Sequence, residues 1–234
     1  MREFPGLMGV LYSTTEWIMR FSVINVFWFL MNIPNVIIIL SFYFNISSNE
    51  FLLYLIPLVI LIPALFFPST IAMFATARDL VMKKDQNSIT KAFFSYLKSY
   101  YKKSFLSGII LMSVWLTWVA DLYYFKNEND LIRTVILLVG ILLFVYTINF
   151  CSLIVHYYMN IKTLLINTFF VTFGNPVLFF FVLVSNFLLF YISASKFLFL
   201  FPIFTGSLSA FFSFSVFYRF TLKIEKKAMS IKSS

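Results

Sequence analysis

The chain is poor in the residues from which disulfides, metal sites and most active sites are built. It contains one cysteine, Cys151, and one histidine, His156, and only 12% of its residues are charged, about half the roughly 25% of an average soluble domain. A single cysteine excludes both an intrachain disulfide framework and a cysteine metal cluster. A lone histidine cannot supply a zinc site by itself. We therefore expect no metal and no cofactor.

Catalytic sequence patterns are absent as well. The sequence has no glycine-rich loop that could cradle a phosphate, no serine, histidine and aspartate set at a nucleophile elbow, and no close pair of carboxylates within an apolar run. These absences predict that the protein is not an enzyme. The net charge of +9 does not indicate nucleic-acid binding, because basic residues beside apolar segments are explained by membrane orientation and by anionic lipid headgroups.

Long apolar runs occupy most of the sequence, and hydrophobic residues make up 61% of it. A helix needs about 20 apolar residues to cross a bilayer. Six runs meet this length, at residues 21–44, 51–77, 104–125, 131–157, 175–193 and 197–218. The connections between them are too short to form a domain of their own. The sequence therefore predicts an all-α, multi-pass membrane protein in which residues 1–234 form one domain.

The distribution of positive charge predicts the orientation of these spans. If the N-terminus lies inside, all but three of the 18 lysines and arginines fall on the inner side, and the exceptions are Lys126, Arg133 and Lys196. Cytoplasmic segments carry an excess of lysine and arginine. We therefore expect both termini in the cytoplasm and an even number of spans.

Residues 87–103, between the second and third spans, have the pattern of an amphipathic helix. Apolar Ile89, Phe93, Leu97 and Tyr100 share one side, and the basic residues near the other side are Lys91, Lys98, Lys102 and Lys103. Such a helix lies in the membrane interface, with its apolar face in lipid and its lysines at anionic headgroups. The alternative is a docking surface for a partner protein.

The second apolar run contains three prolines, Pro57, Pro63 and Pro68. Each proline removes a backbone donor and crowds the carbonyl four residues earlier, so we expect a kinked or interrupted helix. Interrupted spans occur at the substrate sites of transporters, whereas a purely structural kink is the commoner alternative.

Polar residues recur at helical spacing in the third span. Ser113, Thr117 and Asp121 are four residues apart and share one face. An acidic residue at membrane depth indicates proton or cation handling. The alternative is a position near the outer interface, where water or Tyr123 satisfies Asp121.

The fourth span carries a second polar edge, formed by Tyr146, Asn149 and His156. This spacing would direct the edge into the helix bundle. Because no second histidine is present, His156 is expected to act as a hydrogen-bonding or interface residue.

Scattered aromatic, polar and proline positions resemble the YesL-like family of bacterial integral membrane proteins. The matching positions are Tyr12, residues 16–20, Asn25, Trp28, Pro34, residues 68–74, Arg78, residues 93–98 and Asp121. The positions that occupy the family's motif are Trp17, Arg20, Asn25, Trp28, Pro68 and Arg78. The resemblance implies a bacterial inner-membrane protein, often encoded near carbohydrate-uptake transporters and sensor kinases, and it carries over no catalytic residue.

These observations lead to three functional hypotheses. The first is a non-enzymatic accessory protein that associates with a carbohydrate transporter or its sensor, because few ionisable groups lie within the spans. The second is a small transporter or channel that uses the proline-broken span and the Asp121 stripe. The third is a structural or signalling protein with neither a partner transporter nor a flux of its own.

Overall fold

The computed structural model describes residues 7–44, 51–84, 88–125 and 129–232. Arg2 and Lys126, which contribute to the charge pattern, lie outside the described residues. Residue 87, where the amphipathic helix was expected to begin, also lies outside them.

The described chain is helical throughout, with short connections. The helices are α1 (Leu7–Phe44), α2 (Phe51–Leu61), α3 (Phe67–Val81), α4 (Ile89–Tyr124), α5 (Asp130–His156), α6 (Ile161–Gly174), α7 (Pro176–Ser195) and α8 (Gly206–Lys232). Two π-helical turns, η1 (Ile62–Phe66) and η2 (Phe201–Thr205), directly precede α3 and α8. The all-α class predicted from the sequence is confirmed.

Six stretches of the described chain are long and apolar enough to cross a membrane. They are Thr14–Phe44, Leu53–Val81, Ile89–Tyr124, Asp130–His156, Pro176–Ser195 and Phe201–Lys227. Large apolar side chains such as Leu53, Leu137 and Phe187 point outward from these helices and are exposed. An apolar surface of this extent is unfavourable in water and is covered when lipid surrounds the protein. The protein is therefore a multi-pass membrane protein.

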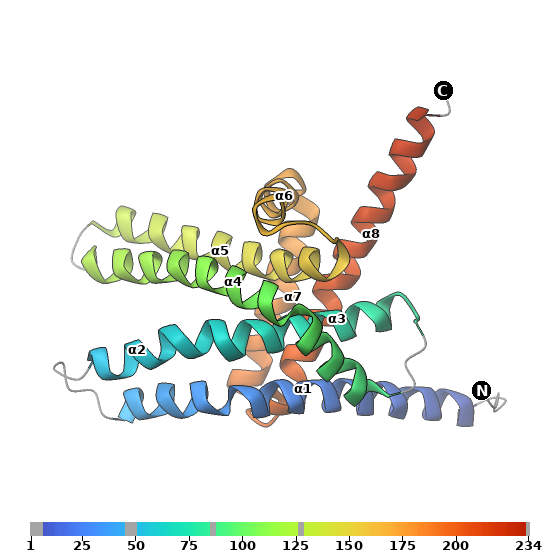
Figure 1. The fold of residues 1–234 in the computed structure, drawn as a ribbon, viewed down its shortest axis with the longest axis horizontal. Coiled ribbons are helices and arrows are strands. Elements are labelled where there is room, and N and C mark those ends of the chain that lie inside the picture. The colour runs from blue at the N-terminus through green and yellow to red at the C-terminus, as the bar shows by residue number, and fades with distance from the viewer. Residues whose placement is uncertain (1–6, 45–50, 85–87, 126–128, 233–234) are drawn as a thin grey trace.

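The helices pack in two directions. α1, the α2–η1–α3 span and α5 run side by side along the long axis, and α7 and α8 cross them at a steep angle (Figure 1). The start of α1 and the end of α8 both lie towards the right of this view.

The second span is interrupted, as its prolines predict. Pro57 lies inside α2, Pro63 is buried in η1, and Pro68 is buried at the start of α3. The interruption takes the form of a wide π-helical turn, which accommodates the backbone groups that the prolines leave without regular helical partners. A second π-helical turn, η2, contains Pro202 and was not predicted.

The amphipathic segment is not a separate interfacial helix. It continues without a break into the third span, and the first part of α4 runs obliquely across α3 before the rest follows α5 (Figure 1). Its apolar side packs on the protein core and not in lipid: Phe93 is fully buried and stacks on Phe27 of α1, with ring centroids 6.0 Å apart. The prediction that the apolar side of this segment faces lipid is therefore wrong.

Helix α6 was also missed by sequence analysis. Asn160 caps its start by accepting a hydrogen bond from the Thr163 amide at 2.9 Å, and Asn175 caps α7 by accepting one from the Leu178 amide at 3.2 Å. Pro176 occupies the first turn of α7. These are ordinary helix-start signals, and α6 itself is too short to cross a bilayer.

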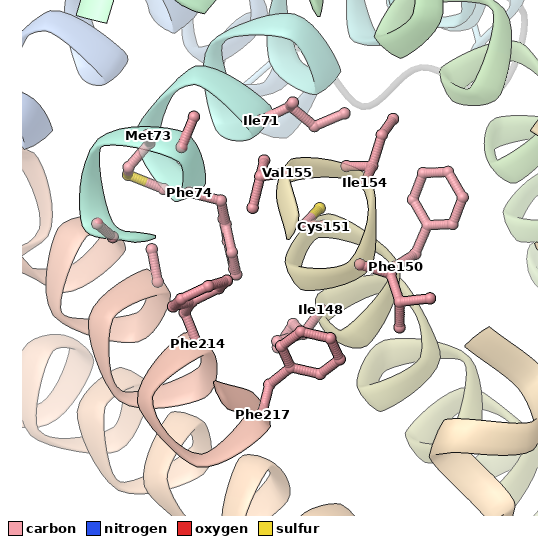
Figure 2. Close-up of a cluster of buried hydrophobic side chains, with 14 of the residues drawn as sticks. Ile71, Met73, Phe74, Ile148, Phe150, Cys151, Ile154, Val155, Phe214 and Phe217 are labelled. Atoms are coloured by element: carbon pink, nitrogen blue, oxygen red, sulfur yellow. The ribbon is translucent and has the colours of Figure 1, made fainter. Parts of the chain in front are cut away.

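The core lies where α3, α5 and α8 meet. Figure 2 shows Ile71 and Phe74 of α3, Cys151 and Val155 of α5, and Phe214 of α8 directed towards one another. Helix α3 is buried along nearly its whole length. The remaining spans are therefore arranged around it.

The contact between α4 and α5 predicts the first mutational effect. An added Cβ at Gly140 would lie 2.3 Å from Cζ2 of Trp118, whose indole nitrogen donates to the Ile136 carbonyl at 2.8 Å. Gly140→Ala should displace this ring and lower the free energy of unfolding by about 1–3 kcal/mol, measured by thermal unfolding in detergent. Gly174→Ala is the matched control, because nothing lies within 4 Å of its added Cβ. Equal stability of the two variants would contradict this packing.

Candidate functional site

Asn25, in α1, holds the start of the last span. Its side chain is fully buried. Its Nδ2 donates to the Phe201 carbonyl at 2.9 Å, and its Oδ1 accepts from the Ser207 amide at 2.8 Å. An added Cβ at Gly206 would lie 2.8 Å from this Oδ1, so the glycine permits the close approach. Asn25 thus satisfies backbone groups on both sides of the interruption at η2 and fixes α8 against α1.

Polar contacts continue from α1 to the start of α3. The Trp28 indole nitrogen donates to Thr70 Oγ1 at 2.9 Å, and Asn32 Nδ2 donates to Ser69 Oγ at 2.9 Å. Ser69 and Thr70 directly follow Pro68 and are buried. The motif residues Asn25, Trp28 and Pro68 therefore come together at one junction, which joins α1, α3 and η2.

A cavity of about 510 Å³ lies beside this junction. It is bounded by residues of both interrupted spans and of α4 and α5, and its walls are mainly aromatic, aliphatic and sulfur-containing side chains. The lining residues include Trp28, Phe67, Met73, Met112, Trp115, Cys151, Phe190 and Phe201. Cavities of roughly 300–1,000 Å³ are typical of small-molecule sites.

A largely buried ion pair lies near the other end of α3. Arg78 Nη2 is 2.8 Å from Asp79 Oδ1. The Arg78 guanidinium also donates to the Val155 carbonyl of α5 and lies 5.3 Å from the centre of the Tyr96 ring. The Tyr96 hydroxyl donates to Asp79 Oδ2. This cluster ties α3 to α4 and α5.

Arg78 was singled out in the sequence, but its neighbour Asp79 was not. The available signal was an acidic residue directly after a basic one at the end of an apolar run. A charge at such a position requires a partner, because desolvation of an unpaired ion is costly. Tyr96, on the next helix, could not have been assigned to the pair without the fold.

The predicted polar edge of α5 is divided between two surroundings. Asn149 is fully buried, and its Nδ2 donates to Thr172 Oγ1 of α6 at 3.1 Å. His156 instead lies among aromatic rings, with centroid distances of 5.9 Å to Phe214 and 5.8 Å to Tyr218. Within the described part of the chain, no group of three or more histidine, cysteine, aspartate or glutamate residues could hold a metal ion.

The tyrosine after His156 lies just beyond the fourth span. Burial raises the pKa of the Tyr157 hydroxyl, and the negative charge of Glu225 raises it further. Tyr157 therefore remains neutral over the physiological pH range.

The stripe of the third span faces away from the helix bundle. Ser113, Thr117 and Asp121 are all exposed. The two hydroxyls donate to backbone carbonyls of their own helix, Ser113 to Ile110 at 2.7 Å and Thr117 to Ser113 at 2.8 Å. Asp121 lies in the last turn of α4, which ends at Tyr124. The stripe is thus directed towards lipid or towards another protein and does not line an internal path.

The remaining predicted residues lie on the surface of α4 and along the first turns of α1. Lys91, Lys98 and Lys102 are exposed and Lys103 is half-buried. The ammonium group of Lys103 lies 5.4 Å from the centre of the Tyr158 ring.

In α1, Trp17 packs edge-on against Phe211 of α8, with ring centroids 5.6 Å apart. Arg20 Nη2 lies 2.5 Å from Glu16 Oε1, one helical turn away.

One buried polar cluster gave no signal that sequence analysis used. Asn186 of α7 is fully buried. Its Nδ2 donates to Ser213 Oγ at 3.0 Å, and its Oδ1 accepts from the Ser209 hydroxyl. Asn186 and its serine partners are far apart in the sequence, so the contact between α7 and α8 could not be identified without the fold.

Part of the chain matches a known protein family. Residues 21–122 match the family described as "Protein of unknown function, DUF624", so this stretch is a DUF624 family domain. The matched stretch contains α3, Asp121 and the α1 and α3 residues of the junction and of the Arg78 cluster. Their partners Phe201, Ser207 and Val155 lie beyond it, as do Asn149 and His156, and Trp17 and Arg20 precede it. No curated protein and no solved structure matches the chain.

Asn25→Ala should destabilise the junction. The substitution removes both partners of the backbone groups at Phe201 and Ser207, and each buried group left unsatisfied costs about 1–3 kcal/mol. We expect a lower free energy of unfolding, measured by thermal unfolding in detergent. Asn167→Ala is the control, since the hydrogen bond that Asn167 Nδ2 donates to the sulfur of Met159 is weak. If Asn25→Ala lowers the free energy of unfolding no more than the control does, Asn25 does not secure η2.

Asp79→Asn should strongly lower the free energy of unfolding of the protein. It leaves the charge of Arg78 largely buried without its counter-ion. Breaking a buried pair in this way costs about 3–5 kcal/mol. The double change Arg78→Met with Asp79→Leu should cost less, since neither charge then remains. Glu16→Gln serves as the reference, because the more exposed pair with Arg20 should contribute only about 0–1 kcal/mol. A double variant that is less stable than Asp79→Asn would refute this ordering.

Proposed function

We propose that this protein is a non-enzymatic accessory protein of the bacterial cytoplasmic membrane, of the YesL-like kind. In this proposal it binds a solute transporter or its sensor, with carbohydrate as the expected solute class. Both termini lie in the cytoplasm, and the lysines of α4 face anionic lipid headgroups.

The position of the polar groups within and outside the bundle is the main support for this proposal. Inside, the amides and hydroxyls of Asn25, Asn32 and Asn186 are engaged in hydrogen bonds between helices. The buried ion pair of Arg78 is confined to one end of α3. Outside, the stripe of Ser113, Thr117 and Asp121 (the α4 stripe) faces the surroundings. Polar groups on a lipid-facing surface favour contact with another membrane helix, where they gain hydrogen-bond partners.

The orientation rests on charge and on the arrangement of the helix ends. The start of α1 and the end of α8 lie at the same side of the molecule (Figure 1). Exposed basic residues gather at the end of α3 and in the last turns of α8, at Lys83, Lys84, Lys223, Lys226 and Lys227. Placing these residues in the cytoplasm follows the positive-inside rule.

The alternative, a small sugar or ion transporter, has less support. Its predicted residue Asp121 is exposed at the end of α4, and the cavity beside the interrupted spans is lined mainly by apolar side chains. A sugar hydroxyl or an ion transferred into such surroundings loses its water without gaining equivalent partners. Flux of candidate sugars or ions in reconstituted vesicles, abolished by Asp121→Asn, would favour the transporter over the accessory protein.

Purification from the native cell in mild detergent tests the accessory function. We expect a stoichiometric membrane partner, and we expect the paired change Ser113→Leu with Thr117→Val to reduce its recovery at least tenfold. The matched control is Ser195→Leu with Thr134→Val, because these exposed hydroxyls also donate to carbonyls of their own helices. Recovery of the wild-type chain alone would refute the proposal, and full recovery of the partner with the altered stripe would exclude the α4 stripe as the binding surface.

A further inference from the structure

The cavity beside the α1–α3 junction has no use in the accessory function described above, yet it is a defined internal space. It lies between the two interrupted spans, with residues of η1 and η2 in its walls. π-helical turns often occur at functional sites. Both turns line the same cavity of about 510 Å³, which makes this region a candidate binding site.

The polar groups in the cavity wall are already engaged with the protein. The indole nitrogens of Trp28 and Trp115 donate to the hydroxyls of Thr70 and Thr147, at 2.9 and 3.2 Å. The other two wall hydroxyls bond outside the cavity lining, Thr205 with Ser193 and Ser209 with Asn186. A polar ligand would therefore find few free partners in this cavity, whereas an apolar ligand would be well accommodated.

We propose that the cavity binds a hydrocarbon chain of a membrane lipid. The walls supply aromatic rings and the flexible sulfur side chains of Met73 and Met112, which adapt to an irregular apolar shape. Phe190 and Phe201 line the cavity. Their ring centroids are 6.2 Å apart, and each residue is 37% exposed. This pair forms the entrance from the bilayer, and the polar headgroup of the lipid stays outside it.

A second hollow of about 400 Å³ shares two lining residues with the first and would extend the space open to a bound chain. It lies among α4, α5 and α6, and Trp115 and Thr147 line both spaces. The hydrogen bond between these two residues holds the indole ring as a partition. Trp115 is therefore the residue that limits the length of the bound chain.

Binding of phosphatidylglycerol to the delipidated protein, followed by native mass spectrometry in detergent, tests the site. We expect saturable binding of one dilauroyl phosphatidylglycerol per chain. Cys151→Phe places a ring in the cavity and should weaken this binding at least tenfold. Leu138→Phe, on the exposed face of α5, is the matched control and should bind like wild type. Unchanged binding in Cys151→Phe would overturn the proposal, because the lipid would then be held elsewhere, for example by its headgroup at basic residues.

The partition supplies a second test that does not depend on the folding of Cys151→Phe. Trp115→Ala should join the two hollows and increase the binding of dioleoyl over dilauroyl phosphatidylglycerol several-fold. The control is Trp118→Ala. The Trp118 ring packs against that of Trp115, with ring centroids 5.3 Å apart, but Trp118 lines neither hollow. The same chain-length preference in both variants, or no saturable binding by the wild-type protein, would refute the assignment.

Discussion

Hydrogen-bond satisfaction of the backbone within lipid is the constraint on which this structure depends. A bilayer supplies no water to an interrupted helix, so each backbone group released at η1 or η2 needs a partner from the protein. Asn25 supplies such partners at η2, with one donor and one acceptor on a single buried side chain. The interruption at η2 is therefore tolerated because α1 lies against it, and the position of α1 is fixed by the same contact.

Helix α3 connects this junction to the rest of the protein. One end contributes Ser69 and Thr70 to α1, and the other contributes Arg78 and Asp79 to α4 and α5. Between these polar ends, apolar residues such as Ile71 and Phe74 pack against α5 and α8 (Figure 2). Apolar packing supplies no strong preference for protein over lipid, because lipid chains are equally apolar. The polar contacts at the two ends therefore determine which helices meet.

The sequence predicted the parts of this fold that depend on local composition. Apolar run length identified the membrane-length helices, and Pro57, Pro63 and Pro68 identified the interrupted span. Predictions that depended on tertiary neighbours were less successful. The amphipathic pattern around Phe93 could not distinguish burial in lipid from burial against Phe27, since both surroundings are apolar.

Prediction of the polar residues was limited in the same way. Helical spacing correctly gave Ser113, Thr117 and Asp121 a common face, but spacing alone does not say whether that face points inward. Asn25 was singled out through a family resemblance, and its role at η2 depends on a residue far along the chain, Phe201. The junction and the outward stripe thus represent two different uses of polarity within this protein. Inside, amides such as those of Asn25 and Asn186 bind other polar groups, and the cavity between the interrupted spans is lined mainly by apolar side chains. Outside, the stripe keeps the ionisable side chain of Asp121 exposed. In the accessory function proposed above, this surface, and not an internal pathway, would recognise another polar membrane component.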